Sequence, residues 1–298
     1  MHPCQRRGAD ANPLAMAQKK PRRHEDLDLF ARIFKVFADT PWLHYGLWLP
    51  GETPSMPTLR QAQERYVDKL VALLPPAPAS VLDIGGGTGA MAGRLHSLGY
   101  EVEMLTPSSV QVGIAREELG DTVKVHLTRL EEFATDRKFD VCLFSESFQY
   151  MPMAVSLPKA KAMLKPGGRV VVADCFRSEN YKGGRQIGGG HRFTNLPPAA
   201  AAAGFRIASD EDVTAMAAGT ILLDQRVYRE VIAPIVAGAG ESIRARNALA
   251  HWLIGQAYRL FVKPAERDRI ADRLKAEHRT PERFMEMNTY RFLRLEQI

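Results

Sequence analysis

The sequence SVLDIGGGTGA at residues 80–90 decides the fold. The apolar run SVLDI is typical of a short buried strand, and the glycines after it indicate a sharp turn into a helix. Glycine permits the dihedral angles of such a turn and the close approach of a ligand. Gly85, Gly87 and Ala90 satisfy the dinucleotide-binding fingerprint. Asp83 precedes the first glycine by two residues, where its carboxylate can meet an ammonium group. This position favours a ligand that carries an ammonium group over a dinucleotide.

Strand-like and helix-like patterns alternate along the rest of the core. Residues 139–147, FDVCLFSES, are almost continuously apolar, as expected of a strand buried on both faces. Alternating strands and helices predict an α/β fold with a doubly wound, mostly parallel, seven-stranded Rossmann-like sheet. We predict further strands at 101–106, 122–127, 168–176 and 288–297, helices at 89–99, 109–120 and 154–164, and a helix followed by a sixth strand within 196–214.

The chain divides into five segments. Apolar residues recur at helical spacing over 26–38 and 58–74, and the aromatic loop 40–54 joins these two expected helices. A polar, glycine-rich stretch at 178–193 is predicted to be an active-site loop. The segments are a disordered basic tail (1–23), N-terminal helices with an aromatic entry loop (24–76), the sheet-bearing core (77–213), a helical cap of two or three helices (214–276) and the last strand of the core (277–298).

Charge and composition exclude several partners. The 298 residues carry a net charge of +6, of which residues 1–23 carry +5, so the core is nearly neutral. A nucleic-acid binder should carry its basic patch on the folded domain, so we expect no nucleic-acid partner. No apolar run reaches about 18 residues and no signal peptide precedes the core, so we expect a cytoplasmic protein with no integral membrane segment. The alternatives are that the tail is a solvated leader, or that the start is misassigned and Met16 is the true one.

The three cysteines give no sign of a metal site. Cys4, Cys142 and Cys175 form no CxxC pair, and Cys142 and Cys175 lie in apolar runs where cysteine usually acts as a small hydrophobic residue. No histidine and carboxylate cluster has ligand spacing either, so we expect no metal.

A later segment indicates which family of proteins the glycine turn is typical of. LKPGGR at 164–169 leads from a helix into the fifth strand, and with the turn and FDVCLFSES it resembles the class I S-adenosylmethionine (SAM) dependent methyltransferases over about residues 79–176. The resemblance implies SAM as the cofactor. It implies that the turn from Gly85 through Gly86 and Gly87 to Gly89 faces the adenosine and methionine parts of SAM. Asp83 would then hold the ammonium group, directly or through water.

A second resemblance reaches further toward the amino terminus. Residues 43–74 begin with LHYGLW, and together with SESFQYMP at 145–152 they resemble a subgroup holding rebeccamycin-type sugar O-methyltransferases and tocopherol C-methyltransferases. This implies that His44, Tyr45 and Trp48 lie over the cofactor. The alternative interpretation of these aromatic residues is a buried plug.

The sequence departs from the family pattern where the ribose and adenine should bind. The acid that usually ends the second strand is replaced by Met104, and the neighbouring Glu103 should point to the other face. Ribose contact then falls to Thr106, Ser108 or Gln111. The full set of cofactor contacts expected besides the glycine turn, Asp83 and Tyr45 is Thr106, Gln111, Thr128, Leu130 and Ser145.

The catalytic residues also depart from the sugar O-methyltransferases, because Gln149 and Tyr150 replace their histidine pair. Methyl transfer needs a base only when the acceptor must lose a proton. The candidates are His191 in the glycine-rich loop, Glu146 at the end of the fourth strand, and Tyr150. The alternative for His191 is an exposed loop histidine, and the alternative for Glu146 is a hydrogen bond to the entry loop. We expect Tyr45, Glu146 and His191 to surround the transferred methyl, closed from above by the cap.

We therefore expect a methyltransferase acting on a small-molecule acceptor: a secondary metabolite, a sugar, or a lipid-like or isoprenoid-like compound. The sequence leaves open whether an O, N or C atom is methylated. Two alternatives stay open: a SAM-binding module that is non-catalytic or serves a partner protein, and a lipid methyltransferase at the membrane surface. The second is indicated by residues 243–263, which combine an apolar face with Arg244, Arg246, Arg259 and Lys263. A homodimer is retained as a hypothesis.

Overall fold

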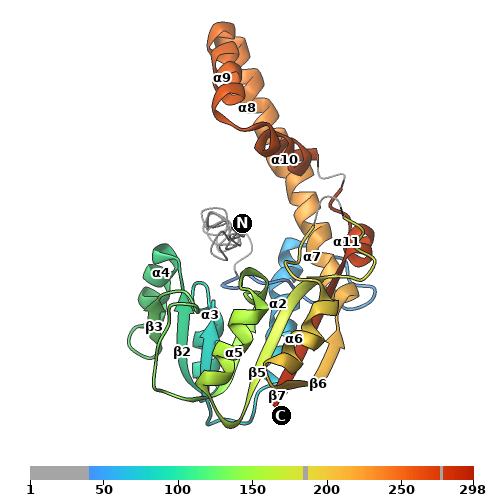
Figure 1. Ribbon diagram of the computed structural model, residues 1–298. Coiled ribbons are helices and arrows are strands. Elements are labelled where there is room, and N and C mark those ends of the chain that lie inside the picture. The colour runs from blue at the N-terminus through green and yellow to red at the C-terminus, as the bar shows by residue number, and fades with distance from the viewer. Residues whose placement is uncertain (1–39, 184–186, 276–277) are drawn as a thin grey trace, which may run out of the picture.

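The computed structural model describes residues 40–183, 187–275 and 278–298. The tail predicted at 1–23 and the helix predicted at 26–38 lie outside this range. The centre of the molecule is a seven-stranded sheet in the order β3-β2-β1-β4-β5-β7-β6 (Figure 1). The strands are β1 (Ser80–Ile84), β2 (Glu101–Thr106), β3 (Lys124–Leu127), β4 (Phe139–Ser145), β5 (Leu164–Arg177), β6 (Phe205–Asp212) and β7 (Asn288–Gln297).

The sheet confirms the predicted fold class. Strands β1 to β5 pair in parallel, whereas β7 runs antiparallel to both β5 and β6, between which it lies. Each predicted strand is present within a few residues of its expected place. The largest difference is β5, which begins at Leu164 instead of Gly168 because Leu164 already pairs with Phe139 of β4.

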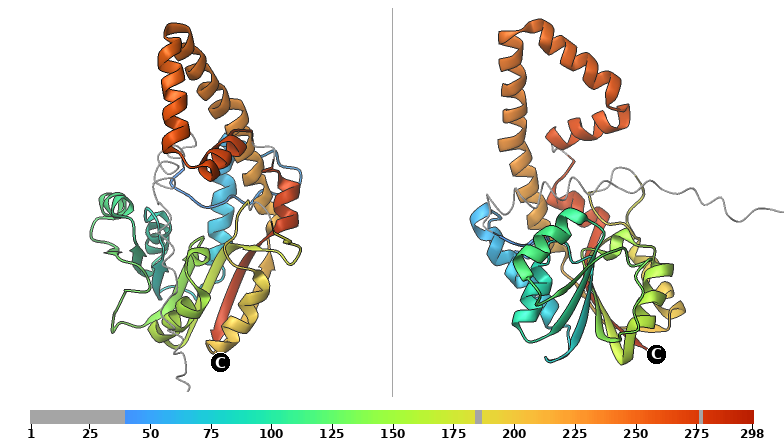
Figure 2. Two further views of the ribbon diagram at one scale, coloured as in Figure 1. Left: turned by 45° about the horizontal axis from the view of Figure 1, so that its top comes forward. Right: turned by 90° about the vertical axis from the view of Figure 1, so that its left-hand side faces the viewer.

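Helices cover both faces of the sheet, as the right-hand view of Figure 2 shows. One face carries α2 (Met56–Val71), α3 (Ala90–Ser97) and α4 (Ser109–Leu119), and the other carries α5 (Met153–Met163) and α6 (Leu196–Ala202). Successive strand residues alternate between the two layers because strand side chains point to opposite faces. In β4, Val141 and Leu143 join the α2–α3 layer while Cys142 and Phe144 join the α5–α6 layer.

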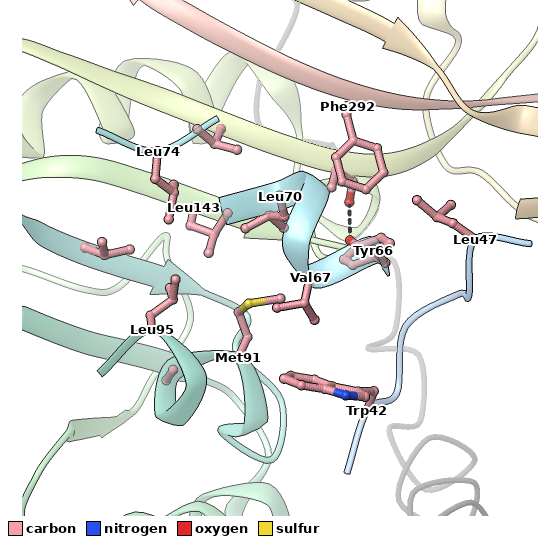
Figure 3. Packing of buried hydrophobic residues seen from close by; sticks show 14 of the residues in the cluster. Trp42, Leu47, Tyr66, Val67, Leu70, Leu74, Met91, Leu95, Leu143 and Phe292 are labelled. Atoms are coloured by element: carbon pink, nitrogen blue, oxygen red, sulfur yellow. Dashed lines mark hydrogen bonds between the residues drawn. The ribbon is translucent and has the colours of Figure 1, made fainter. Parts of the chain in front are cut away.

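The α2 layer is the larger and holds the aromatic residues that support the site. Tyr66 of α2 is fully buried, and its ring meets the ring of Phe292 edge-on with centroids 4.9 Å apart. Trp42 lies beside Met91 and Val67 in the same layer (Figure 3). This packing fixes the start of the described chain against the sheet.

The segment between β6 and β7 is helical, as predicted, but it contains more helices than expected and does not lie across the sheet. Its helices are α7 (Thr214–Val227), α8 (Ala233–Arg246), α9 (Ala248–Phe261), α10 (Pro264–Lys275) and α11 (Pro281–Met287). A π-helical stretch, Tyr228–Ile232, continues α7 into α8. Helix α7, the π-helical stretch and α8 thus form one continuous rod. Because this rod has no break, α8 projects away from the core, and α9 lies beside α8 instead of covering the sheet (Figures 1 and 2).

Across the described residues, no helix combines the length and apolar character needed to cross a bilayer.

Candidate active site

The glycine turn closes tightly against its neighbours. Gly85, Gly87 and Gly89 have φ angles of +83°, +58° and +87°, a region in which side chains are strained. The Gly85 amide donates to the Leu105 carbonyl at 2.9 Å, which ties the turn to β2. A Cβ atom on Gly85 would lie only 2.5 Å from the Cβ of Ser147, so this glycine is required for packing.

The turn is open at a single glycine of this group. A Cβ atom on Gly86 would lie 2.6 Å from an oxygen of Asp83, and one on Gly89 would lie 2.7 Å from Leu119. At Gly87 the nearest atom is a methyl group of Leu43 at 3.9 Å. The backbone around Gly87 is therefore the part of the turn that a ligand can approach.

Asp83 is the most unusual side chain at this edge. It is fully buried, and neither carboxylate oxygen has a hydrogen-bond partner among the described residues. Burial raises the pKa of this carboxyl to about 7, since no donor stabilises its charged form. A buried carboxylate normally has donors or a cation beside it, so the site fits a ligand that carries positive charge.

Glu146 follows β4 with a left-handed backbone, φ +53°, which is uncommon for a residue with a side chain. Its Oε1 accepts hydrogen bonds from the Tyr45 amide at 2.7 Å and from the Tyr290 hydroxyl at 2.6 Å. Burial raises the pKa of Glu146 to about 7 despite these two donors. The entry loop, β4 and β7 thus meet at one carboxyl group, and the bond from Tyr45 is the entry-loop hydrogen bond expected as the alternative role of Glu146.

Asp174 on β5 provides a second buried carboxyl nearby. Its oxygens accept hydrogen bonds from the Gln149 amide at 2.9 Å and from the Gln149 side chain at 3.0 Å. Burial, with the charge of Glu146 as a further cause, raises the pKa of Asp174 to about 8. Gln149 replaces a histidine of the sugar O-methyltransferases that the sequence resembles. Its side chain and backbone amide are held in place by these hydrogen bonds.

The entry-loop residues separate into two environments. The His44 ring stacks on Tyr66 at 4.0 Å, and burial lowers its pKa to about 4, so the ring is neutral. Its Nδ1 donates to the Tyr45 carbonyl at 2.8 Å, which leaves a buried Nε2 without a partner among the described residues. Trp48 instead packs with Leu59 and other apolar side chains, as a buried plug does.

His191 lies on the other side of β4 from the tyrosines. Its Nε2 is 2.8 Å from the Met151 carbonyl and its ring packs edge-on against Phe148, a residue of the α5–α6 layer. This nitrogen therefore acts as a donor, and a base function of His191 would fall to Nδ1. Tyr150 is mostly exposed.

The expected ribose and adenine contacts lie at the ends of β2 and β3. The Thr106 hydroxyl donates to the Gln111 side chain at 2.8 Å, and Ser108 caps α4. Leu130 is buried, and the Thr128 amide donates to the Thr106 carbonyl at 3.2 Å. Ser145 shares a 2.9 Å hydrogen bond with the Tyr66 hydroxyl instead of lying beside these residues.

The structure shows where the side chains lie at the end of β2, where Met104 replaces the usual acid. Met104 is fully buried beneath the glycine turn. Glu103 bonds His126 at 2.7 Å and Arg137 at 2.8 Å. Its carboxylate is thus used within the sheet edge and does not reach the turn.

Three polar residues of the site were not singled out from the sequence: Tyr66, Asp174 and Tyr290. Asp174 was detectable as an acid within the otherwise apolar run VVVADCF. Tyr66 and Tyr290 resemble ordinary aromatic core residues, and only the packing of α2 and β7 brings their hydroxyls to the site. Across residues 40–183, 187–275 and 278–298, no group of three or more His, Cys, Asp or Glu side chains is arranged to hold a metal ion.

A methyltransferase domain family matches residues 58–206, half of the chain, which include the glycine turn, Glu146 and Asp174. The chain belongs to this family. The match ends before α7, so the projecting helices lie outside it.

Named relatives are similar over parts of the domain. An uncharacterised methyltransferase of Mycobacterium tuberculosis is 31% identical over 116 residues, which cover 39% of this chain and 48% of that protein. A probable chloroplastic tocopherol O-methyltransferase of Oryza sativa is 29% identical over 151 residues, 46% of this chain and 42% of that protein. The chain thus spans about half the length of these relatives. The tocopherol name agrees with one part of the predicted subgroup, although this relative is named an O-methyltransferase and the prediction was of C-methyltransferases. The rebeccamycin-type part of the prediction is not confirmed.

Solved structures share the fold over nearly the whole chain. Cyclopropane synthase MmaA2 from Mycobacterium tuberculosis has a TM-score of 0.64 at 16% identity, covering 94% of this chain and all of that one. Geranyl diphosphate C-methyltransferase from Streptomyces coelicolor, in complex with S-adenosyl-L-homocysteine, has a TM-score of 0.63 at 14% identity, covering 92% and 98%. At these identities the likeness concerns the fold.

Proposed function

We propose that this protein is a SAM-dependent methyltransferase that acts on a small-molecule acceptor. The observation that carries the proposal is the buried carboxyl of Asp83, which lies under the glycine turn and has no hydrogen-bond partner among the described residues. An α-ammonium group is the donor that this carboxyl lacks. A nicotinamide dinucleotide offers no such cation to that position.

SAM, when bound, supplies a methyl group on a positively charged sulfur. The residues of this chain would bind it and position the acceptor. Asp83 would hold the ammonium group, and the open backbone at Gly87 would face the nucleoside. Holding an acceptor in line with the methyl can contribute up to about 7–11 kcal/mol to the acceleration.

Glu146 is the group best placed to act on the acceptor. Its carboxyl lies at the carboxyl edge of the sheet, and the Tyr45 amide and Tyr290 hydroxyl fix its orientation. With a pKa of about 7, it can accept a proton from an acceptor near neutral pH. Tyr290 is a positioning residue in this arrangement, and Tyr45 borders the space for the acceptor.

The apolar and aromatic surroundings of Glu146 suit an acceptor of low polarity. Tyr45 stacks on Phe284 at 5.9 Å and tilts against Tyr290 at 5.4 Å. Tocopherol and geranyl diphosphate, named for the relatives above, are isoprenoid compounds, which supports an acceptor of that kind.

Calorimetry tests the cofactor assignment directly. S-adenosylhomocysteine should bind the purified protein and NADH should not. Equal binding of the two would overturn the assignment. A labelled-SAM assay on fractionated extract of the source organism, with mass analysis of the product, would then identify the acceptor and the methylated atom.

A further inference from the structure

The α8–α9 arm is an unusually exposed part of this protein. Neither helix contains a buried residue, although both are apolar in composition. Asn247 joins them and caps α9, because its side-chain oxygen accepts the Ala250 amide at 2.9 Å. Figures 1 and 2 show the arm standing clear of the core.

The exposed side chains of α9 are large. Phe261 is 85% exposed, Leu260 80% and Trp252 57%. Leu249, Trp252 and Leu253 recur at the spacing of one helix face. Soluble proteins rarely leave such a contiguous apolar surface uncovered, so this arm has the character of a binding surface.

Charge decides between the candidate partners. Residues 233–263 contain four basic side chains, Arg244, Arg246, Arg259 and Lys263, and a single acidic one, Glu241. All four cations are exposed, and none forms an ion pair with a described residue. A second copy of the arm would bring the same positive charge, whereas an anionic lipid surface is complementary to it.

The dimensions fit a helix that lies in a membrane surface. The 14 residues of α9 extend about 21 Å, shorter than a hydrocarbon core of about 30 Å. Trp252 and Tyr258 are amphipathic rings of the kind enriched at the boundary between headgroups and acyl chains. Cations around an apolar helical face are typical of such interfacial helices.

We propose that the α8–α9 arm docks on an anionic lipid bilayer, with the apolar side chains of α9 among the acyl chains and its cations at the headgroups. The rod of α7 and α8 starts at the carboxyl edge of the sheet, where Thr214 bonds the Tyr290 amide and Thr220 bonds the Gly46 amide. Docking therefore holds that edge at a fixed place relative to the membrane. The proposal stands independently of the reaction that the site performs.

Tryptophan fluorescence of the full chain tests the docking. Trp42 and Trp48 are each 4% exposed, so Trp252 is the tryptophan whose emission a vesicle can change. Vesicles of phosphatidylglycerol and phosphatidylcholine should shift this emission to the blue, and brominated acyl chains should quench it. Pure phosphatidylcholine vesicles should bind more weakly, and added salt should weaken binding to the anionic vesicles.

Variants separate the arm from other cationic segments. Leu260→Glu with Phe261→Glu should lower affinity for anionic vesicles at least about tenfold, because two apolar side chains no longer insert. Arg244→Gln and Arg246→Gln should each lower it about fivefold. Leu127→Glu, at an exposed apolar site on β3 far from the arm in the sequence, is the control and should bind as wild type.

Three outcomes would overturn the proposal. The first is no shift of Trp252 with anionic vesicles at low salt. The second is sedimentation with vesicles that persists unchanged in the Leu260→Glu, Phe261→Glu variant, which would assign binding to the cationic residues 1–23. The third is Trp252 emission that is already blue without lipid and shifts to the red on dilution, which would assign the arm to a second copy of this chain.

Discussion

Replacing Asp83 with asparagine would separate two consequences of its buried carboxyl. Burial, with no hydrogen-bond partner in the part of the chain that the structure describes, raises the pKa of this group from 3.8 to about 7. The unfolded chain ionises the same carboxyl near its ordinary value, so between about pH 4 and 7 the folded protein keeps a proton that the unfolded chain has lost. Protonation of Asp83 therefore contributes to the free energy of unfolding. This contribution is present in full below about pH 4 and is lost as pH rises through about 7.

The magnitude follows from that difference. About 3 pKa units at about 1.36 kcal/mol per unit give a penalty of at most about 4 kcal/mol for the ionised carboxylate in the free protein. An asparagine amide carries no charge, but its own unsatisfied groups cost about 1–3 kcal/mol. At about pH 8.5 the cofactor-free Asp83→Asn variant should therefore exceed wild type in free energy of unfolding by about 1–3 kcal/mol. This advantage should shrink toward zero near pH 5.

The same substitution should weaken cofactor binding, because the neutral amide no longer pairs with an ammonium group. Loss of a charge-assisted hydrogen bond of about 1.5–3 kcal/mol corresponds to a 10- to 150-fold rise in the Kd for S-adenosylhomocysteine. Urea denaturation over a pH series measures the first effect, and titration calorimetry measures the second.

Asp140→Asn is the matched control with the opposite sign. Burial of Asp140 is outweighed by hydrogen bonds from Lys165 and Ser80, which lower its pKa to about 2. Its contribution to stability is present above the unfolded pKa, so this variant should be less stable than wild type at about pH 8.5. The reasoning is refuted if Asp83→Asn is the less stable of the pair there, or if it binds S-adenosylhomocysteine as wild type does.

Three further predictions concern the same edge of the sheet. Gly85→Ala should lower the free energy of unfolding by about 2–4 kcal/mol, from left-handed strain and a steric clash, whereas Gly51→Ala, with a similar φ but open space, should lose about 1–2 kcal/mol by urea denaturation. Glu146→Gln should reduce kcat about 100-fold and Tyr290→Phe about tenfold, each with little change in S-adenosylhomocysteine affinity; equal losses in affinity would make both residues cofactor ligands. His191→Ala should cost about 100-fold, relieved at high pH, only if the acceptor must be deprotonated, and a pH–rate profile of the variant decides this.

The sheet was predictable because its evidence is local. SVLDIGG, FDVCLFSES and NTYRFLRLEQ carry their strand patterns in consecutive residues, and the glycine turn marks where the first strand ends. Asp83 was identified by its spacing from Gly85, and the structure adds that its carboxyl is buried with no hydrogen-bond partner within residues 40–183, 187–275 and 278–298. Periodicity gave the helices of 214–276, yet their direction depends on the π-helical joint at Tyr228–Ile232, which has no pattern of its own.

The chemistry around Glu146 was only half predictable, because its partners come from distant parts of the chain. Tyr45 and Glu146 were named from the resemblance, and the structure joins them by a hydrogen bond. Tyr290 is 144 positions away from Glu146. Its place in the sequence indicates an ordinary aromatic residue of the core. His191 was selected because histidine as a residue type titrates near neutral pH. A sequence cannot show which carbonyl the ring will bond.

The place of β7 between β5 and β6 has a consequence for folding. Among the described residues, strand β6 pairs with β7 and not with β5, and β7 follows in the chain only after helices α7 to α11. Closing so long a loop is slow, so β6 and β7 should join the sheet after β1 to β5 have assembled. The hydroxyl of Tyr290 arrives with β7, and the carboxyl of Glu146 therefore acquires its orientation in the final stage of folding. In hydrogen exchange, the amides of β6 and β7 should open together as one unit, with the sheet's other strands still protected.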